Sequence, residues 1–473
     1  MNNNGIIFLY GAPASGKSTL GRRLAERLDA RFSDLDDEIV SRAGRPIPEI
    51  FASDGEPAFR DLESKALAEV CGGGQASGRP LVVSLGGGTL LRDANRALAE
   101  SSGSVFCLDA PDDAELARRI GSAAGSRPLG NKARERAPHY ASFPKRVAAS
   151  FEAGPSLVVV GCGIARDILA GLPFVADGSV ARIYGGSLPS SPIAVVPSGE
   201  EHKTPATVAA LWSAFAKAGL GRRDVVAALG GGVTGDLVGF AAATWMRGID
   251  WINFPTTLLS MVDASTGGKT GCDLPEGKNL AGAFHAPRLV VIDTDFLKTL
   301  PPAVLADGRA EMIKHEAIGG LDRSAPPTGV PSPAEIARNL MVKVGIVRED
   351  PYERLGRRML LNCGHTVAHA VERLSGYSVS HGSAVAIGCV AEARLAVRFG
   401  LAPKSWPDEF AARFAAAGLP TELPAGMSEE GLAPVMSGDK KKSGGGVVAF
   451  ALPCGWGDVR SVPVRVEGRL ERC

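Results

Sequence analysis

Three histidines and one glutamate are the residues of this chain whose types and spacing best suit metal chemistry. His365 and His369 are four residues apart, so if 366–374 is helical they lie on one face, and His381 follows His365 by sixteen residues. Divalent zinc accepts imidazole nitrogen together with carboxylate oxygen, and Glu311, in another predicted helix, is the best carboxylate candidate. A histidine pair on a helix is also a common surface or core feature, so the pair alone leaves both interpretations open.

A glycine-rich segment near the N-terminus suits phosphate chemistry. An apolar run over 6–10 predicts a strand, residues 11–19 read GAPASGKST and fit the pattern GxxxxGK[ST], and a helix is predicted over 19–28. In such a loop, backbone N–H groups wrap a phosphate, the lysine reaches the terminal phosphates, and the next hydroxyl binds magnesium. The expected ligands of ATP and Mg²⁺ are Gly11, Gly16, Lys17, Ser18 and Thr19.

Residues 5 to about 153 resemble shikimate kinase. The resemblance rests on this loop, on two aspartates after a second strand, on an arginine in GEPAFRDLE, on a triglycine after the strand 81–85, and on the motifs SRPL and RAPHY. The two motif arginines, Arg127 and Arg136, are only nine residues apart, which indicates a shortened lid. The resemblance implies shikimate binding by Asp36, Arg60, Arg136 and the backbone of Gly86, Gly87 and Gly88, a magnesium shell ordered by Asp34, and a catalytic lid arginine at Arg127.

A second glycine-rich turn, GGGVTGD at 230–236, follows the buried strand predicted at 224–229. It is not a P-loop, because no GK[ST] follows it. A dinucleotide pyrophosphate is the ligand that such a strand-to-helix turn typically binds. A purely structural turn is the alternative that this motif alone leaves open.

The chain from residue 197 to the C-terminus resembles 3-dehydroquinate synthase. The matching motifs are GGGVTGD, PTTLL, VDASTGGKTG, GKNLAGAFHAP, RAEMIKH, NCGHTVAHAVE and a late DKK, in that order. The resemblance implies that Zn²⁺ (or Co²⁺) is held by Glu311, His365 and His381. NAD would be held by Glu200, Lys203, Gly231, Gly232, Asp236, Thr256 and Thr257. The substrate, 3-deoxy-D-arabino-heptulosonate 7-phosphate, would contact Arg247, Asp263, Lys269, Lys278, Asn279, Lys314, Arg358, Asn362, His369 and Lys441.

The resemblance also implies the chemistry of this second site. NAD acts as a catalytic oxidant that is regenerated, and the metal acts as a Lewis acid on a substrate hydroxyl oxygen. Lys314 and His369 would shuttle protons or stabilise oxyanions, and the Asp263 carboxylate would face the substrate hydroxyls. Any one of the lysines alone reads equally well as a solvated surface charge, whereas together they match an anionic sugar phosphate.

Bulk composition indicates an ordinary globular protein. The chain has 473 residues, 45% hydrophobic and 22% charged, with a formal net charge of +1, so no nucleic-acid partner is implied. No apolar run is long enough to span a bilayer and no charged-then-apolar leader opens the chain, which predicts a cytoplasmic location. Eight cysteines without CxxC spacing predict reduced thiols.

We expect three α/β or helical units. Residues 1–153 are predicted to form a P-loop kinase domain with a parallel sheet, residues 154–305 a Rossmann-like NAD-binding domain, and residues 306–473 a mostly helical metal-binding domain. The expected function is bifunctional: ATP-dependent 3-phosphorylation of shikimate, and synthesis of 3-dehydroquinate. One alternative is an active synthase with a non-catalytic kinase-like module, and another is a cyclase for a related sugar phosphate. A homodimer through the synthase half is expected from the resemblance alone.

Overall fold

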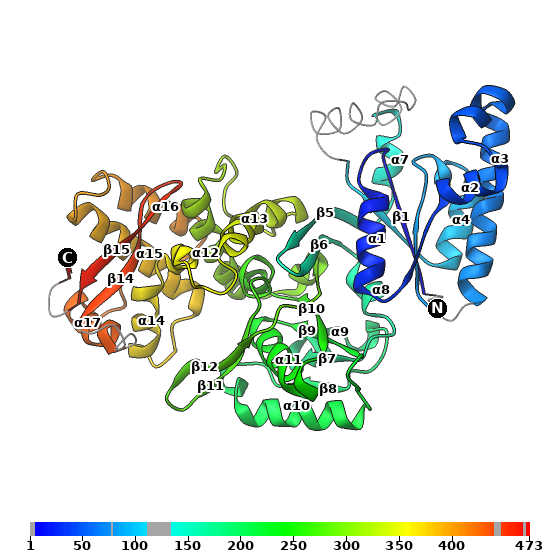
Figure 1. Cartoon of the computed structure of the whole chain (residues 1–473). Coiled ribbons are helices and arrows are strands. Elements are labelled where there is room, and N and C mark those ends of the chain that lie inside the picture. The colour runs from blue at the N-terminus through cyan, green and yellow to red at the C-terminus, as the bar shows by residue number, and fades with distance from the viewer. Residues whose placement is uncertain (1–4, 77–78, 111–133, 439–445, 467–469) are drawn as a thin grey trace.

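One eleven-stranded sheet runs through both the N-terminal and the central part of the molecule, in the order β2-β3-β1-β4-β5-β6-β13-β10-β9-β7-β8. The computed structural model describes residues 5–76, 79–110, 134–438, 446–466 and 470–473. The N-terminal part (blue) and the C-terminal part (orange to red) lie at opposite ends, with the central part between them (Figure 1). None of the described helices combines the length and apolar character that a membrane span requires.

The N-terminal part has the parallel α/β arrangement predicted from its motifs. Its buried strand β1 leads through the glycine loop into α1, as the apolar run and the GK[ST] pattern indicate. Helix α3 changes direction at Gly55, whose φ of 80° is left-handed. The elements are β1 (Ile6–Gly11), α1 (Lys17–Arg27), β2 (Arg31–Asp34), α2 (Leu35–Ala43), α3 (Ile47–Ala76), β3 (Leu81–Ser84), η1 (Thr89–Leu91), α4 (Asp93–Ser102), β4 (Ser104–Leu108) and α7 (Ala137–Ala141).

The central part continues the sheet with six mutually parallel strands. Its strands are β6 (Ser156–Cys162), β7 (Phe174–Asp177), β8 (Ala194–Val196), β9 (Val225–Gly230), β10 (Asp250–Pro255) and β13 (Leu289–Asp293). Its helices are α8 (Ala165–Leu169), α9 (Gly178–Tyr184), η2 (Gly185–Ser187), η3 (Glu200–His202), α10 (Pro205–Lys217), α11 (Gly232–Thr244), η4 (Trp245–Arg247), η5 (Ser260–Ala264) and η6 (Thr294–Thr299). A separate antiparallel hairpin, β11 (Lys269–Leu274) and β12 (Gly277–Phe284), projects from it.

Strand β5 (Arg146–Ala153) joins the two halves of the sheet. It pairs in parallel with β4 on one side and antiparallel with β6 on the other, after a tight turn at Gly154, whose φ is 64°. The apolar core beneath this junction is also shared. Leu9, Leu20 and Leu24 of the N-terminal part belong to the same buried cluster as Leu157 and Val159 of the central part. The sheet and its core therefore cross the expected boundary at 153/154 without interruption.

The C-terminal part is a helical unit with a small sheet that was not predicted. Helix α13 begins with a capping box formed by Ser332 and Glu335 and packs against β5 and β6. Gly364 and Gly388 let α14 and α15 approach closely, since a Cβ at Gly388 would lie 2.0 Å from the Gly364 carbonyl oxygen. The elements are α12 (Pro302–Gly319), α13 (Pro333–Glu349), η7 (Arg357–Asn362), α14 (His365–Leu374), α15 (His381–Arg398), α16 (Trp406–Ala416), α17 (Glu429–Gly438), β14 (Val447–Gly455), β15 (Asp458–Arg465) and β16 (Glu471–Arg472).

The shared sheet predicts that the two halves unfold together. All five tryptophans lie C-terminal to Gly154, so tryptophan fluorescence reports on the central and C-terminal parts alone. Mg·ADP, the ligand expected for the phosphate loop, should nevertheless raise the tryptophan-monitored midpoint of urea unfolding. At about 100 times its Kd the ligand adds about 2.7 kcal/mol to the stability of any unit that contains its site.

Lys17→Met is the control for this experiment, because ADP acting through the nucleotide turn of the central part would still shift the midpoint of that variant. An unchanged tryptophan midpoint in the wild-type chain, at ADP concentrations shown by calorimetry to saturate the loop, would mean that the halves unfold independently.

Candidate functional sites

The phosphate loop brings its lysine, hydroxyl and carboxylate together at the carboxyl end of β1. The Lys17 ammonium donates to the carbonyl oxygens of Gly11 (3.0 Å) and Ala12 (2.7 Å), and burial lowers the pKa of Lys17 to about 8. Ser18 donates to a carboxylate oxygen of Asp34 at 2.6 Å, so two oxygen ligands suited to magnesium lie side by side. Gly16 takes up a left-handed φ of 94°, and Thr19 is exposed on the first turn of α1.

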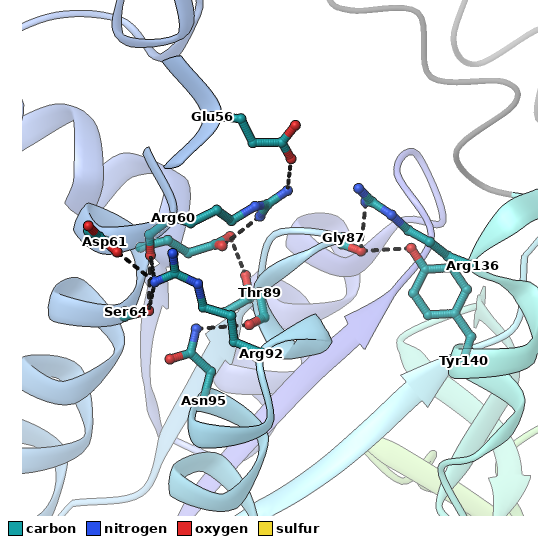
Figure 2. Close-up of polar contacts among 11 residues, drawn as sticks. Glu56, Arg60, Asp61, Ser64, Gly87, Thr89, Arg92, Asn95, Arg136 and Tyr140 are labelled. Atoms are coloured by element: carbon teal, nitrogen blue, oxygen red, sulfur yellow. Dashed lines mark hydrogen bonds and ion pairs between the residues drawn. The ribbon is translucent and has the colours of Figure 1, made fainter. Parts of the chain in front are cut away.

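A second set of polar groups surrounds the triglycine turn after β3 (Figure 2). Arg60 donates to Glu63 at 2.6 Å and to Glu56 at 3.0 Å, and Glu63 is only 1% exposed. The Arg60 guanidinium lies against Gly88, where a Cβ would come within 2.6 Å of it. The carboxylates therefore hold the guanidinium beside the turn.

The other side of the triglycine turn is fixed by α7. The Gly87 carbonyl oxygen accepts hydrogen bonds from Arg136 (3.2 Å) and from the hydroxyl of Tyr140 (2.7 Å), as Figure 2 shows. A Cβ at Gly86 would lie 3.3 Å from a carboxylate oxygen of Asp36, so this aspartate also borders the turn. The structure thus brings together the residues predicted for shikimate, namely Asp36, Arg60, Arg136 and Gly86–Gly88. Arg127 lies outside the described residues.

Glu63 and Thr89 were not predicted as members of this site. Thr89 donates to Glu63 at 2.6 Å, and Asn95 donates to the Thr89 carbonyl oxygen at 2.9 Å, so the chain after the turn is tied to α3. The i,i+3 spacing of Arg60 and Glu63 was the only available signal, and on a helix that spacing usually marks an exposed ion pair.

The metal-suited residues converge in the C-terminal part. Oε1 of Glu311, on α12, lies 3.5 Å from Nε2 of His365 and 3.5 Å from Nε2 of His381. Glu311 is fully buried, and its Oε1 accepts no hydrogen bond among the described residues. One buried carboxylate oxygen facing two imidazole nitrogens is a donor set that fits a divalent zinc or cobalt ion. His369 is exposed, and its ring centroid lies 5.6 Å from that of His365.

The electrostatics of this cluster keep the Glu311 carboxylate ionised. Burial raises the pKa of Glu311, but the Lys314 ammonium and the two imidazoles outweigh it and hold that pKa well below its usual range. Burial lowers the pKa of His365 to about 3, so its imidazole is neutral and able to act as a ligand at neutral pH. Lys314, itself buried, is ion-paired with Glu311.

Asp263 lies next to this cluster and has a partner that was not predicted. The Lys343 ammonium, on α13, is 2.7 Å from Oδ1 of Asp263 and 2.6 Å from its backbone carbonyl oxygen. Nε2 of the buried His315 is 3.9 Å from the same Oδ1, and Asp263, Glu311 and His315 form a second group with the geometry to hold a metal. Lys343 carries no motif signal, since a single lysine in an amphipathic helix usually points to solvent.

The second glycine turn begins α11 and lies against the segment after β10. Gly231 precedes the first turn of the helix, and a Cβ there would lie 3.2 Å from the Thr257 methyl group. The Lys203 ammonium lies 2.7 Å from a carboxylate oxygen of Asp236 and 2.6 Å from Oδ1 of Asn279. Most of the residues predicted for NAD are therefore neighbours at the carboxyl edge of the sheet, namely Lys203, Gly231, Gly232, Asp236, Thr256 and Thr257.

The cationic residues predicted for the substrate are held by acidic side chains or by backbone carbonyl oxygens. Lys278 lies 3.6 Å from Glu200 and 4.0 Å from Glu372, and its ammonium is 4.4 Å from the ring centroid of Tyr377. The Arg358 guanidinium donates to the carbonyl oxygens of Gly267 and Pro351. Lys269 pairs with Glu353 at 2.7 Å, and Asn362, half-buried, ends η7.

Two predicted substrate ligands remain, Lys441 and Arg247. Lys441 lies outside the described residues. Arg247 follows the C-terminus of α11, whose 13 residues span about 20 Å from the glycine turn at its other end. Arg247 and Met246 both have left-handed φ values, 72° and 49°, which are uncommon for residues with side chains.

Comparison with known proteins identifies both halves. A family model of shikimate kinase matches residues 13–149, and models of the N-terminal and C-terminal parts of 3-dehydroquinate synthase match residues 193–307 and 308–442. The 3-dehydroquinate synthase of Synechococcus sp. is 43% identical over 316 residues, covering 62% of this chain and 85% of that protein. That of Xanthomonas campestris is 45% identical over 267 residues, covering 53% and 72%.

Two solved structures resemble the central and C-terminal parts. A 2-deoxy-scyllo-inosose synthase complexed with carbaglucose-6-phosphate, NAD⁺ and Co²⁺ aligns with a TM-score of 0.56 at 26% identity, over 66% of this chain and 94% of that one. A 2-epi-5-epi-valiolone synthase from Streptomyces hygroscopicus, with NAD⁺ and Zn²⁺ bound, aligns with a TM-score of 0.57 at 26% identity, over 67% and 94%.

The convergence of the Glu311 carboxylate with two imidazoles predicts which substitutions will weaken metal binding. His365→Ala and His381→Ala should each weaken zinc binding by more than about 100-fold, because loss of even an outer partner of a ligand costs 10–100-fold. His315→Gln is the matched control, since His315 belongs only to the alternative group with Asp263. Zinc affinity is measured by competition with a chromophoric chelator. Loss of zinc in the His315 variant, with retention in the other two, would assign the metal to the alternative group.

Proposed function

This chain belongs to the 3-dehydroquinate synthase family and carries a shikimate kinase domain before the synthase, and on this premise we propose that it catalyses two steps of the shikimate pathway. One site transfers phosphate from ATP to the 3-hydroxyl of shikimate. The other converts 3-deoxy-D-arabino-heptulosonate 7-phosphate to 3-dehydroquinate and phosphate. The observation that carries the synthase assignment is the buried Oε1 of Glu311, 3.5 Å from two imidazole nitrogens.

In the kinase site, the chain's own groups bind and orient both reactants. Lys17 and the backbone of Gly11 and Gly16 would hold the phosphates, while Ser18 and Asp34 would order Mg²⁺. Arg60 and Arg136 lie on two sides of the triglycine turn, where they would bind the shikimate carboxylate. Asp36 would accept a hydrogen bond from a substrate hydroxyl. Catalysis then depends mainly on positioning and on charge stabilisation of the transferred phosphoryl group.

In the synthase site, Glu311, His365 and His381 would hold Zn²⁺ or Co²⁺, which when bound supplies Lewis-acid chemistry to a substrate oxygen. NAD, held at the glycine turn beside Thr256 and Thr257, supplies a hydride acceptor that the reaction regenerates. Lys314 supplies buried positive charge next to Glu311, which suits stabilisation of a developing oxyanion.

Several side chains of this site would bind the substrate or transfer protons. Lys343 keeps the Asp263 carboxylate ionised, because its charge helps to lower the pKa of that carboxyl against the effect of burial. An ionised Asp263 would accept hydrogen bonds from substrate hydroxyls. His369 is exposed beside His365 and would exchange protons with solvent. Five further residues would supply polar groups for the carboxylate and phosphate of the substrate, namely Lys269, Lys278, Asn279, Arg358 and Asn362.

The alternatives are less well supported. A cyclase for another sugar phosphate is disfavoured because the 3-dehydroquinate synthases are 43–45% identical to this chain, whereas the two other cyclases are 26% identical. A non-catalytic kinase module is disfavoured because Lys17, Ser18 and Asp34 retain the contacts that a phosphate site requires.

The two activities should be separable on the full chain by single substitutions. Lys17→Met should abolish shikimate phosphorylation, and any ATP hydrolysis without shikimate, while leaving dehydroquinate formation near the wild-type rate. Glu311→Gln should abolish dehydroquinate formation while leaving shikimate phosphorylation near the wild-type rate. Product and NADH are followed together by chromatography and absorbance at the nicotinamide band.

The synthase reaction should require NAD without accumulating NADH, since the overall conversion is redox-neutral. NADH that accumulates in step with product would contradict the proposed reaction, and unchanged phosphorylation in the Lys17 variant would contradict the kinase assignment.

We also propose that the chain acts as a homodimer whose partner completes each synthase site. Arg247 lies at the amino end of β10, whereas Thr256 and the glycine turn lie at its carboxyl end, roughly 20 Å away along the strand and helix. If Arg247 binds substrate, it must reach the site of a second copy. Its strained, left-handed backbone is consistent with a side chain directed outward for such a role.

A complementation experiment tests this arrangement. Arg247→Ala and His365→Ala should each be inactive as synthases, but a one-to-one mixture of reassorted subunits should regain about a quarter of wild-type activity, because half the dimers are mixed and each has one intact site. No recovery on mixing, or a monomeric mass by light scattering at micromolar concentration, would contradict the proposed dimer.

A further inference from the structure

The two imidazoles that face Glu311 are each held at their other ring nitrogen. Nδ1 of His365 lies 3.0 Å from the Cys363 carbonyl oxygen, and Nδ1 of His381 lies 3.4 Å from Oε1 of Glu372. A carbonyl oxygen can only accept, so His365 carries its proton on Nδ1 and directs the Nε2 lone pair at Glu311. Oε1 of Glu372 lies within reach of Nδ1 of His381, which leaves Nε2 of that ring facing Glu311.

Glu372 is well placed to orient His381. It lies on α14 seven residues after His365, about two helical turns, so the same helix face supplies one imidazole and the partner of the other. Glu372 is buried, with its side chain 8% exposed, and Lys278 lies 4.0 Å from its Oε1 on the hairpin β11–β12.

His381 needs this partner more than His365 does. The His381 side chain is 35% exposed, whereas that of His365 is 12% exposed. Packing therefore restrains the His381 ring less than it restrains the ring of His365. A fixed hydrogen bond at Nδ1 is what remains to hold Nε2 toward Glu311.

We propose that Glu372 is a positioning residue of the metal centre, which fixes the tautomer and ring orientation of His381. This inference rests on the proposed metal site of Glu311, His365 and His381. Outer partners of this kind typically change metal affinity 10–100-fold. Glu372 is not one of the three proposed ligands, and it would act through its contact with His381.

The test compares three substitutions in the full-length protein without substrate or NAD. Glu372→Ala removes the acceptor, and Glu372→Gln keeps an acceptor oxygen but removes the charge. Glu409→Gln is the matched control: Glu409, on α16, is a carboxylate that accepts from the ring N–H of Trp456 at 2.6 Å. Zinc affinity is measured by chelator competition, and the visible spectrum of the Co²⁺-loaded protein reports on ligand geometry. Circular dichroism establishes that each variant is folded.

We expect Glu372→Ala to weaken zinc binding 10–100-fold and to shift the Co²⁺ bands, Glu372→Gln to have a smaller effect in the same direction, and Glu409→Gln to bind within about twofold of wild type. Wild-type affinity in folded Glu372→Ala, or an equal loss in Glu409→Gln, would overturn the positioning role. Should His365→Ala and His381→Ala keep zinc while Glu372→Ala also keeps it, the metal site itself would be wrong. Should those two lose zinc while Glu372→Ala keeps it, only this inference fails.

Discussion

The carboxylate of Glu311 is entirely withdrawn from water. The arrangement of the C-terminal part depends on this one buried charge. An ionised carboxylate in a dry interior costs several kcal/mol unless opposite charge surrounds it. Lys314 supplies part of that charge from the same helix, and His365 and His381 approach from α14 and α15. The close contact of these two helices, permitted by Gly364 and Gly388, brings the imidazoles to the carboxylate. The packing of these two helices therefore positions the side chains that we propose as metal ligands.

The second constraint is the shared strand. Because β5 pairs with β4 on one side and β6 on the other, the kinase and synthase parts of the sheet are joined through this strand and not by a flexible linker. Helix α13, which carries Lys343 to Asp263, packs on β5 and β6. The two catalytic sites lie on one continuous framework, although dehydratase and dehydrogenase steps must separate their reactions.

Sequence reasoning could predict the residues whose chemistry is carried by local motifs. The glycine loop at Lys17, the turn at Gly231 and the spacing of His365 and His369 each depend on a few consecutive residues, and the predicted strands and helices around them are present. The comparisons confirm the two families and the fold class. The assignment of individual ligands stays a prediction.

The remaining features depend on contacts between distant segments. Lys343 meets Asp263 across 80 positions of sequence, and Thr89 meets Glu63 across 26, without any motif to mark either pair. The shared role of β5 was hidden because a strand's two neighbours cannot be inferred from its own apolar pattern. The small sheet β14–β16 was missed for a similar reason, since its stability comes from packing on α15.

The most direct test of the metal centre is anomalous X-ray diffraction from crystals of the full-length protein, with data collected above and below the zinc absorption edge. We predict a single difference peak in the C-terminal part, about 2.0–2.2 Å from Oε1 of Glu311 and from Nε2 of both His365 and His381. A peak between Asp263, Glu311 and His315, or no peak at Glu311 in protein shown to contain stoichiometric zinc, would contradict the account.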